Sequence, residues 1–215
     1  MHRGYFITGT DTDVGKTYVA AQLAAYFLSL GKRVGVYKPV ASGCVHDGVG
    51  LVSDDAQALW AAAGAPLSLE AVCPQRFEAP LAPYLAAREQ GKSVDAALLR
   101  SGLDAWRAAS DVLIVEGAGG LLSPLSDQDL NADLARDLGL PLIVVAANRL
   151  GVINHTLLTL LAARAYGLEV KGVVLCDVNA SGDLSAASNP RELENICDAP
   201  LLAHVRHGAK VDWRL

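Results

Sequence analysis

The residues with the clearest chemical signature lie near the start of the chain, in the segment GTDTDVGKT at residues 9–17. This segment joins a short apolar run to a helix-like stretch through a glycine-bearing turn that ends in Gly15, Lys16 and Thr17. In such a loop the backbone N–H groups point inward, the following helix presents its positive end, and the lysine reaches the β- and γ-phosphates of a nucleotide. The threonine hydroxyl is a ligand for Mg²⁺. The segment therefore predicts a phosphate-binding loop.

The spacing of this loop differs from the usual pattern by one residue. Four residues normally separate the first glycine from the Gly-Lys pair, whereas residues 10–14 separate them here. A glycine turn that only caps a helix is the alternative interpretation. The intact Gly15-Lys16-Thr17 sequence and the apolar strand before it favour phosphate binding.

Composition and charge favour a single domain that acts on small molecules. The chain has 215 residues, of which 52% are hydrophobic, and no linker rich in proline, glycine or serine divides it, so we expect one domain at residues 1–215. The formal net charge of -5 argues against a broad nucleic-acid footprint or a polybasic membrane surface. We therefore expect small-molecule substrates, with neither nucleic acid nor membrane as a partner.

The sequence also predicts a cytoplasmic protein with reduced thiols. No basic segment followed by an apolar one precedes the first apolar run, which starts at Tyr5, and no apolar run reaches transmembrane length. The four cysteines are scattered without a Cys-x-x-Cys pair, which indicates neither a zinc site nor a disulfide framework.

Apolar runs rich in β-branched residues alternate with helix-like stretches along the chain. The runs are residues 5–8, 34–37, 112–115, 140–146 and 170–176. Such runs, apolar on both faces, are typical of a parallel sheet covered by helices on both sides. Together with the phosphate-binding loop, they predict a single-domain α/β fold of the P-loop NTPase kind, mostly parallel, with ligands at the carboxyl ends of the strands.

Helices should connect these strands. They are expected at residues 16–30, from residue 54 onward, at 94–109, at 130–138, within 148–167 and near 190–196. The proline-punctuated segment 65–91 is expected to cover the site instead of joining the sheet. Residues 201–202 form a further short apolar piece.

Two charged residues at strand ends are candidate site residues. Lys38 follows the run 34–37, with Pro39 fixing the exit of the chain, which places its ammonium group beside the phosphate loop; a solvated lysine is the alternative. Glu116 follows another buried run and precedes glycines that let backbone approach a ligand. Its carboxylate would face the Mg²⁺ held by Thr17, whereas a strand followed by a loose loop is the alternative.

Two helix starts offer further candidates. Asp54 and Asp55 open a helix, where acidic residues usually serve as caps, and only a second metal ligand would favour coordination by Asp55. The helix within 148–167 has N–H groups at its start that can bind an anion.

Taken together, five motifs resemble those of dethiobiotin synthetase, the ATP-dependent enzyme family of biotin synthesis. They are FITGTDTDVGKT, YKPVASG, SDDAQAL, VEGAGGLLSPL and NRLGVINHTLLT, in the order and approximate spacing of that family. The resemblance runs from the first strand to at least Cys176. The extra residue of the phosphate loop agrees with this family.

The resemblance implies an ATP- and Mg²⁺-dependent ligase that closes a ureido ring on 7,8-diaminononanoate. CO₂ would add to one amine to give a carbamate, and ATP would phosphorylate that carbamate. The second amine would then attack the carbamic-phosphoric anhydride, giving dethiobiotin, ADP and phosphate. Every stage builds negative charge on small oxygens, which lysines, Mg²⁺ and backbone donors stabilise.

The resemblance also implies a role for each matching residue. Lys16 would cradle the β- and γ-phosphates, Lys38 would stabilise the carbamate and the transferring phosphoryl group, and Thr12 would join them as the third catalytic residue. The expected Mg²⁺ ligands are Thr17, Asp55 and Glu116. The expected nucleotide-binding residues are Asp13, Val14, Gly15, Lys16, Thr17, Tyr18, Asp55, Glu116, Gly117, Ala118, Gly119, Cys176 and Asp177. The expected substrate-binding residues are Thr12, Ser42, Gly119, Val152 and Asn154.

The resemblance further implies a homodimer. In this family the active site lies across a two-fold axis, and the carboxylate tail of the substrate meets the partner's helix start, here residues 151–154. Val152 stands where a cysteine is common, a change that backbone donation tolerates.

Other positions depart from the family pattern. Asp13 stands where a longer glutamate is frequent, which leaves a proton-accepting role of this residue open. Cys176-Asp177 stands where Asn-Asp is frequent, and a later Gly-x-Ile-Pro element appears as residues 203–206. An asparagine can pair with both a donor and an acceptor of adenine, which a thiol cannot do. ATP is therefore expected without strict selectivity for adenine.

Two other protein classes share parts of this pattern. A switch ATPase of the Min or partition type has the same fold, but such proteins usually carry another lysine early in the loop, where Thr10 and Asp11 stand here, and a basic amphipathic tail is lacking. Related ATP-dependent amidation enzymes normally carry an extra domain, for which this sequence leaves no room. Dethiobiotin synthesis is therefore the favoured interpretation.

Overall fold

The apolar runs of the sequence form a sheet at the centre of the protein. The computed structural model describes residues 3–181 and 183–214. Within them, one six-stranded sheet has the order β2-β5-β1-β6-β7-β8, and each neighbouring pair is parallel. Its strands are β1 (Arg3–Gly9), β2 (Val34–Tyr37), β5 (Val112–Gly120), β6 (Leu142–Ala147), β7 (Val170–Cys176) and β8 (Leu201–Val205). Every residue of β2 and β6 is buried, as expected of strands covered on both faces, and the predicted parallel sheet is confirmed.

The sixth strand was not among the predicted runs. β8 pairs with β7 at the edge of the sheet, and its sequence LLAHV contains an alanine and an exposed histidine that interrupt the apolar pattern. Only its first two residues therefore stand out as apolar in the sequence. Pairing with β7 extends the strand to Val205 and directs the chain back toward the carboxyl edge of the sheet.

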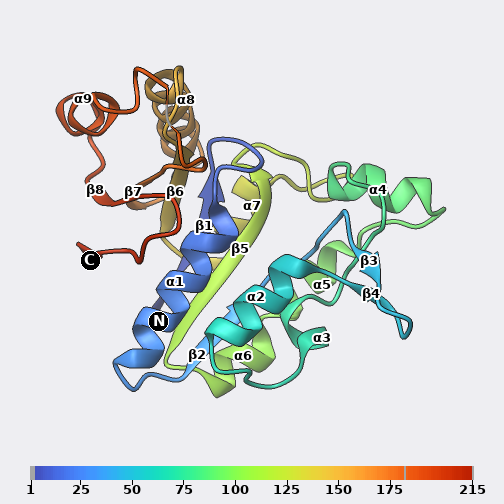
Figure 1. The fold of residues 1–215 in the computed structure, drawn as a ribbon. Coiled ribbons are helices and arrows are strands. Elements are labelled where there is room, and N and C mark those ends of the chain that lie inside the picture. The colour runs from blue at the N-terminus through green and yellow to red at the C-terminus, as the bar shows by residue number, and fades with distance from the viewer. Residues whose placement is uncertain (1–2, 182, 215) are drawn as a thin grey trace.

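Helices cover both faces of the sheet, as predicted. β5 contacts both α1 and α7, and Figure 1 shows α1 in front of the sheet and α7 behind it. The helices are α1 (Lys16–Ser29), α2 (Asp54–Ala62), α3 (Leu69–Val72), α4 (Pro83–Glu89), α5 (Ala96–Ser101), α6 (Asp104–Ala109), α7 (Asn131–Leu138), α8 (Val152–Ala165) and α9 (Asn189–Ile196). In the described part of the chain, no helix has the length and apolar character needed to cross a membrane.

The helix expected at residues 94–109 is two short helices instead. The side chain of Asp95 caps α5 by accepting hydrogen bonds from the backbone of residues 97 and 98, and the chain turns at Gly102 before α6 begins. A Cβ atom at Gly102 would lie 2.3 Å from the hydroxyl oxygen of Tyr37, which donates a hydrogen bond to the carbonyl of Leu98. The buried tyrosine therefore requires glycine at position 102 and bonds the carbonyls of Leu98 and Leu99 in the last turn of α5.

The segment between α2 and α5 packs over the carboxyl edge of the sheet without joining it, as predicted. It contains α3 and α4, and its one pairing in the described chain is an isolated bridge between Ala41 and Arg76. Residues 80–83 of this segment line the cavity described below. The glycine-rich loop between β2 and α2 forms a small hairpin of β3 (Val45–His46) and β4 (Leu51–Val52).

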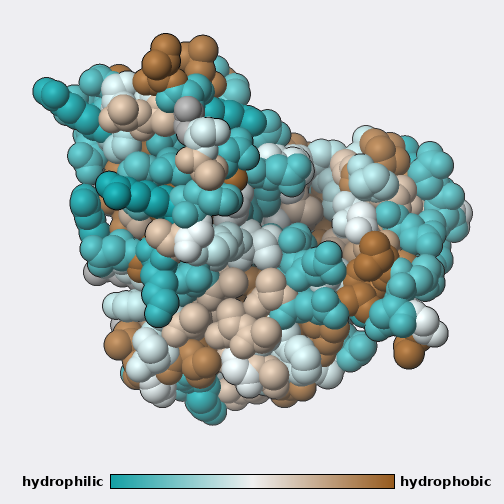
Figure 2. Space-filling view, in the orientation of Figure 1, coloured by the Kyte–Doolittle hydropathy of each residue, from teal (hydrophilic) through white to brown (hydrophobic). Residues whose placement is uncertain are grey.

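The outward face of α8 is apolar. Leu158 and Leu161 are 56% and 60% exposed, and Leu150, just before the helix, is 81% exposed. Hydrophobic side chains gather over α8 in Figure 2, at the top of the view. This helix therefore buries one face against the sheet and leaves leucines on the other.

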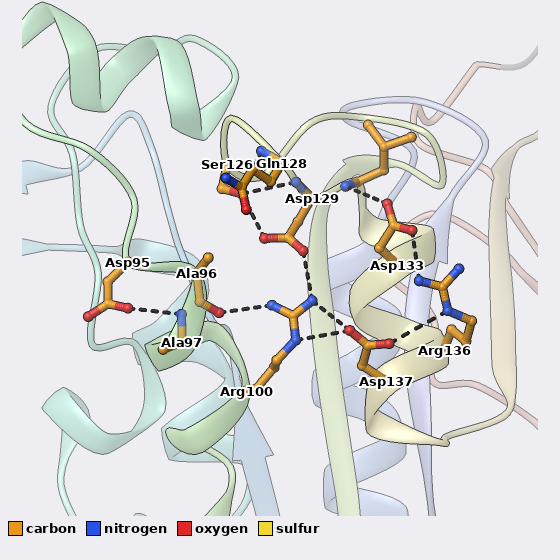
Figure 3. Close-up of polar contacts among 11 residues, drawn as sticks. Asp95, Ala96, Ala97, Arg100, Ser126, Gln128, Asp129, Asp133, Arg136 and Asp137 are labelled. Carbon is orange, nitrogen blue, oxygen red and sulfur yellow. Dashed lines mark hydrogen bonds and ion pairs between the residues drawn. The ribbon is translucent and has the colours of Figure 1, made fainter.

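Arg100 on α5 joins two carboxylates from other segments of the chain (Figure 3). Its Nη2 atom donates to Oδ1 of Asp129 at 2.7 Å and to Oδ2 of Asp137 at 2.6 Å. Asp129 also accepts a hydrogen bond from the hydroxyl of Ser126 at 2.7 Å. Burial alone would raise the pKa of Asp129, but the hydrogen bonds from Arg100 and Ser126 outweigh it and lower that pKa. The network ties α5 and α7 to the loop that follows β5.

This network predicts a pH-dependent contribution to stability. Because the folded pKa of Asp129 lies below its ordinary value, the carboxylate stabilises the fold above about pH 4 and loses this effect as the pH falls through the folded pKa. We expect Asp129→Asn to lower the free energy of unfolding by about 1–3 kcal/mol at neutral pH, and the difference from the wild type to shrink in acid. Urea unfolding over a pH series measures both quantities.

The matched control is Asp127→Asn, because Asp127 is exposed and pairs with Arg88 at the surface. We expect that change to cost less than about 0.5 kcal/mol. A cost of Asp129→Asn that is the same at every pH would contradict the prediction.

Candidate active site

A cavity of about 910 Å³ opens at the carboxyl ends of the strands. It is enclosed by the phosphate loop, the ends of β2, β5 and β7, and the segments 80–83 and 205–208. In Figure 2 the molecule is hollowed between the part that carries α8 and α9 and the part that carries α4. This is the edge at which parallel α/β sheets bind ligands.

Most of the site residues predicted from the sequence line this cavity. They are Thr12, Asp13, Gly15, Lys16, Thr17, Tyr18, Lys38, Ser42, Asp55, Glu116, Ala118, Gly119, Cys176 and Asp177. The fold therefore brings together residues from five separate stretches of the sequence.

Four predicted site residues lie outside the cavity lining. Val14 is only 1% exposed, with its side chain close to Gly9 within the phosphate loop, and Gly117 packs against the side chain of Asn131. Both residues can therefore offer a ligand only their backbone groups. Val152 is buried and Asn154 is exposed at the start of α8, outside the cavity of their own chain. The structure therefore does not bring these last two residues to the other candidates.

The phosphate loop accommodates its extra residue through two left-handed backbone positions. Asp13 has a φ of 55° and Gly15 has a φ of 95°. Aspartate tolerates this region better than most residues, and glycine adopts it freely. Gly15 is also the N-cap residue of α1 and has no side chain to cover the first N–H groups of the helix. The loop thus presents the helix start to the cavity.

The buried Lys38 forms ion pairs with two carboxylates near the phosphate loop. Nζ of Lys38 lies 2.7 Å from Oε1 of Glu116 and 2.6 Å from Oδ2 of Asp55, and Lys38 is 3% exposed. Thr17 donates a hydrogen bond from its hydroxyl to the same Oε1 atom of Glu116 at 2.8 Å. Lys16 donates to the backbone carbonyl of Asp11 at 3.0 Å. Two ammonium groups, two carboxylates and a hydroxyl therefore share one corner of the cavity.

The charges of this cluster perturb one another. Burial would lower the pKa of Lys38, but the carboxylates of Glu116 and Asp55 outweigh burial and raise it, so the ammonium keeps its proton at neutral pH. Burial lowers the pKa of Lys16, against the opposing attraction of Glu116. For Asp55, the charge of Lys38 and the hydrogen bond that Lys38 donates outweigh burial and lower the pKa.

The oxygen atoms of this cluster suit a small divalent cation. Thr17, Asp55 and Glu116 offer one hydroxyl and two carboxylates, the hard ligands that Mg²⁺ prefers. Oε2 of Glu116 is buried and has no hydrogen-bond partner among the described residues. No group of three or more His, Cys, Asp or Glu side chains within residues 3–181 and 183–214 could hold a metal, so any site here depends on the threonine hydroxyl and other oxygens.

The glycine loop after Glu116 lies beside the phosphate loop. Gly119 has a φ of 75°, and a Cβ atom there would lie 2.5 Å from Oγ of Ser123 and 3.7 Å from Oγ1 of Thr12. Glycine therefore allows Thr12 and Ser123 to approach the same stretch of backbone. Ser42 lines the same cavity from the stretch that follows β2.

A thiol occupies the end of the cavity where β7 stops. A Cβ atom at Gly15 would lie 3.3 Å from Sγ of Cys176, which places the thiol against the phosphate loop, and burial raises the pKa of Cys176 to about 12. Asn148 lies nearby, but its amide nitrogen donates to the carboxylate of Asp177 at 2.7 Å and its oxygen accepts from Asn189. This asparagine therefore does not offer its amide in place of Cys176.

Several lining residues were missed by the sequence analysis. Ser123 falls inside the VEGAGGLLSPL motif, which is the signal that could have identified it. Val178 lies just beyond the end of β7, and the segment 205–208 reaches the cavity because β8 returns the chain to this edge. Tyr18 donates a hydrogen bond to the carbonyl of Ala209 at 2.7 Å and fastens that segment to α1. Their sequence carries no phosphate- or base-binding signature, so only the fold reveals them.

Solved structures confirm the predicted P-loop NTPase-like fold. The septum site-determining protein MinD from Pyrococcus horikoshii, complexed with Mg-ADP, aligns with a TM-score of 0.53 at 16% identity, covering 96% of this chain and 82% of that one. The signal recognition particle receptor FtsY from Elizabethkingia anophelis, in complex with GDP, gives 0.55 at 14% identity, covering 100% of this chain and 61% of that one. At such identities these likenesses show the fold alone.

Sequence relatives are much closer. The family described as AAA domain matches residues 3–214. An ATP-dependent dethiobiotin synthetase from Rhodopirellula baltica is 45% identical over 213 residues, covering 94% of this chain and 83% of that protein. One from Bacillus subtilis is 40% identical over 204 residues, covering 93% and 85%. These relatives favour dethiobiotin synthesis over the function of a switch ATPase. The chain belongs to the family of ATP-dependent dethiobiotin synthetases, which are ligases that form carbon–nitrogen bonds.

Proposed function

We propose that this chain closes a ureido ring on 7,8-diaminononanoate in the cytoplasm, with CO₂ and ATP as co-substrates. One amine attacks CO₂ and loses a proton, giving a carbamate. A carbamate oxygen attacks the γ-phosphorus of ATP, and ADP leaves. The second amine then attacks the carbonyl carbon of the carbamic-phosphoric anhydride, and phosphate leaves as the ring closes to dethiobiotin.

The grouping of Lys16 and Lys38 in one cavity is the observation that carries this proposal. The reaction builds negative charge on the carbamate, on the transferring phosphoryl group and on the departing phosphate. Lys16 rises from the phosphate loop, and Lys38 is held against Glu116 with its Nζ 2.7 Å from the carboxylate. Fixed ammonium groups in a water-poor site stabilise such charge without reorganisation during the reaction.

Lys38 is proposed to act through its charge. Because its pKa is raised, it keeps its proton at neutral pH and is unsuited to accept one from an amine. Thr12 and Ser42 line the cavity as neutral hydroxyl groups that suit the carbamate and the amines. Gly119 lies close to Thr12, so this part of the glycine loop would contact the same substrate.

Thr17, Asp55 and Glu116 are proposed to hold Mg²⁺, directly or through water. The partnerless Oε2 atom of Glu116 and the two other oxygen ligands support this assignment. When bound, the ion would neutralise charge on the phosphates of ATP. Asp55 also forms a 2.6 Å ion pair with Lys38, which supports a role for this carboxylate in the site in addition to its place in the first turn of α2.

A homodimer is proposed in which α8 contributes to the partner's site. Gly151 is the N-cap residue of α8, has a φ of 94° and has no side chain to cover the first N–H groups. Val152 and Asn154 follow it, and those N–H groups suit a substrate carboxylate. The exposed leucines of α8 supply an apolar surface of the kind that a second copy would bury.

The proposed reaction is tested with the purified protein, diaminononanoate, bicarbonate, Mg²⁺ and each nucleoside triphosphate in turn. Dethiobiotin is measured by mass spectrometry, and ADP and phosphate are measured in the same samples. We expect one dethiobiotin for each phosphate released. Absence of dethiobiotin with every nucleotide would refute the proposed function.

Lys38→Met tests the electrostatic role of the buried ammonium group. Methionine keeps an unbranched stem but removes the charge, and we expect kcat to fall by about 10²- to 10³-fold. The unpaired carboxylates should also lower the free energy of unfolding by about 3–5 kcal/mol, with the added change Glu116→Gln recovering stability but not turnover. Steady-state kinetics and urea unfolding measure the two effects.

The control is Lys32→Met, which removes the charge of an exposed lysine. A near-normal kcat in folded Lys38→Met protein would show that Lys38 takes no part in the chemistry.

Asp55→Asn tests the magnesium assignment, with Asp54→Asn as its matched control. Both changes remove one charge from the first turn of α2, but Asp54 is exposed and lies outside the cavity lining. We expect Asp55→Asn to weaken binding of a non-hydrolysable ATP analogue at least about tenfold with Mg²⁺ and much less with EDTA. Isothermal titration calorimetry gives all four dissociation constants. Equal losses with and without Mg²⁺ would remove Asp55 from the metal site.

Cys176 predicts relaxed selection of the nucleotide base. A buried neutral thiol lacks the paired donor and acceptor of an amide, so we expect kcat/KM for CTP or GTP to lie within about tenfold of that for ATP. Cys176→Asn should increase the preference for ATP. Competition between nucleotides at limiting concentration measures these ratios, and a strong preference of the wild type for ATP would overturn the prediction.

A further inference from the structure

The last residues of β5 and the turn that follows them are held by one buried side chain. Nδ2 of Asn131 donates hydrogen bonds to the carbonyl oxygens of Ala118 at 2.7 Å, Gly120 at 2.9 Å and Ser123 at 3.2 Å. Oδ1 of Asn131 accepts a hydrogen bond from the backbone N–H of Ala118 at 3.1 Å. The amide of Asn131 therefore bonds the last residues of β5 and the turn that follows, where the β1–β5 pairing is irregular and resumes only at Gly9 and Gly120.

These contacts admit only one orientation of the amide. Asn131 is 0% exposed, so water does not supply alternative partners. Rotation of the amide by half a turn would place its oxygen against three carbonyl oxygens and its NH₂ group against the N–H of Ala118. An asparagine is the side chain that offers both a donor pair and an acceptor in this arrangement. Burial of an amide is stabilising only when its groups are satisfied in this way.

The loop bonded by Asn131 is a wall of the cavity. Ala118, Gly119 and Ser123 line it, and Gly119 lies beside Thr12 of the phosphate loop. Gly117 packs directly on the amide, since a Cβ atom there would lie 2.3 Å from Oδ1 of Asn131. The amide thus contacts the back of the wall, while the opposite side of the wall faces the cavity.

The start of α7 adds backbone bonds to the same loop. Asn131 donates its own N–H to the carbonyl of Ser123 at 3.1 Å, and Ala132 donates to the carbonyl of Leu121 at 3.0 Å. Gly120 donates to the hydroxyl of Ser123 at 2.9 Å. Glu116, by contrast, is held independently by Lys38 and by the hydroxyl of Thr17.

A second set of bonds reaches this region from outside the cavity. Arg100 holds Asp129 and Asp137 at the outer side of α7, as Figure 3 shows. Asp137 is exposed, and its ion pairs in the described part of the chain are with Arg100 and Arg136, not with residues 117–123. The inner bonds of Asn131 and the outer bonds of Arg100 can therefore be disrupted separately.

We propose that Asn131 is a positioning residue for catalysis: its four hydrogen bonds hold residues 118–123 in the conformation that places Gly119 beside Thr12, while the pairing of Gly9 with Gly120 joins the two segments at one point. The proposal rests on the proposed function, because the substrate is taken to bind between Thr12 and Gly119. Asn131 does not touch the substrate. Its removal should therefore disturb the diaminononanoate side of the cavity more than the nucleotide phosphates, which the phosphate loop and Lys16 hold.

The test compares Asn131→Asp with Asp137→Asn, which exchange an amide and a carboxylate on the same helix. Asn131→Asp keeps an acceptor for Ala118 but places a second oxygen against three carbonyl oxygens. We expect it to lower kcat/KM for diaminononanoate at least about tenfold, while the dissociation constant of an ATP analogue changes less than about threefold. Hydrogen exchange should be faster in residues 117–123 and unchanged in residues 9–17. Asp137→Asn should lower the melting temperature but keep kcat/KM within about twofold of wild type.

Every outcome of this comparison decides the proposal. Kinetics of Asn131→Asp within about twofold of wild type, or an equal loss of activity in both variants, would overturn it. If Asn131→Asp does not fold, Asn131→Ser replaces it, since serine is smaller and uncharged and must show the same loss against diaminononanoate. The wild type is assayed in parallel: absence of dethiobiotin from the wild type refutes the proposed function, whereas normal variants beside an active wild type refute only the role of Asn131.

Discussion

The ion pairs of Lys38 are the constraint on which the site depends. A buried ammonium group is costly unless carboxylates surround it, and Lys38 is held between Glu116 and Asp55. The sheet register makes this possible, because Tyr37 pairs with Val115 and the next residues of both strands emerge side by side. β5 also pairs with β1, so Glu116 reaches Thr17 just beyond the phosphate loop. The parallel arrangement of β2, β5 and β1 therefore assembles the charged cluster.

Around this cluster the cavity has walls of different kinds. The phosphate loop is shaped by its own left-handed residues, Asp13 and Gly15, whereas the glycine loop depends on bonds from α7. The far end is closed by β7, β8 and the segment 205–208, which Tyr18 fastens to α1. Nucleotide, metal and substrate would therefore meet where independently supported segments converge.

The sequence predicted those elements whose physics is local. Strands buried on both faces appear as continuous apolar runs, and a glycine-bearing turn before Lys-Thr is a sequence signature of a phosphate-binding loop. The expected helix at 94–109 ends at Gly102, where Tyr37 arrives from β2 and donates a hydrogen bond to the carbonyl of Leu98 at the end of α5. β8 depends on pairing with β7, since its own residues alternate poorly. Contacts distant in sequence decided both features.

The candidate site divides in the same way. Residues 9–17, Lys38 and Glu116 are recognisable from the sequence because each comes at the end of an apolar run, near the edge where a parallel sheet binds ligands, although β5 continues past Glu116 to Gly120. By itself the sequence determined the family, and it predicted the phosphate loop and the charged residues Lys38 and Glu116 as candidates for the site. Only the tertiary structure decided that Asp55 and Glu116 both pair with Lys38, and that Asn148 donates its amide hydrogen bond to Asp177. It also decided that Asn131 bonds the glycine loop. The physical reason is that hydrogen bonds and ion pairs are set by distances in space, which residue type and spacing along the chain do not specify.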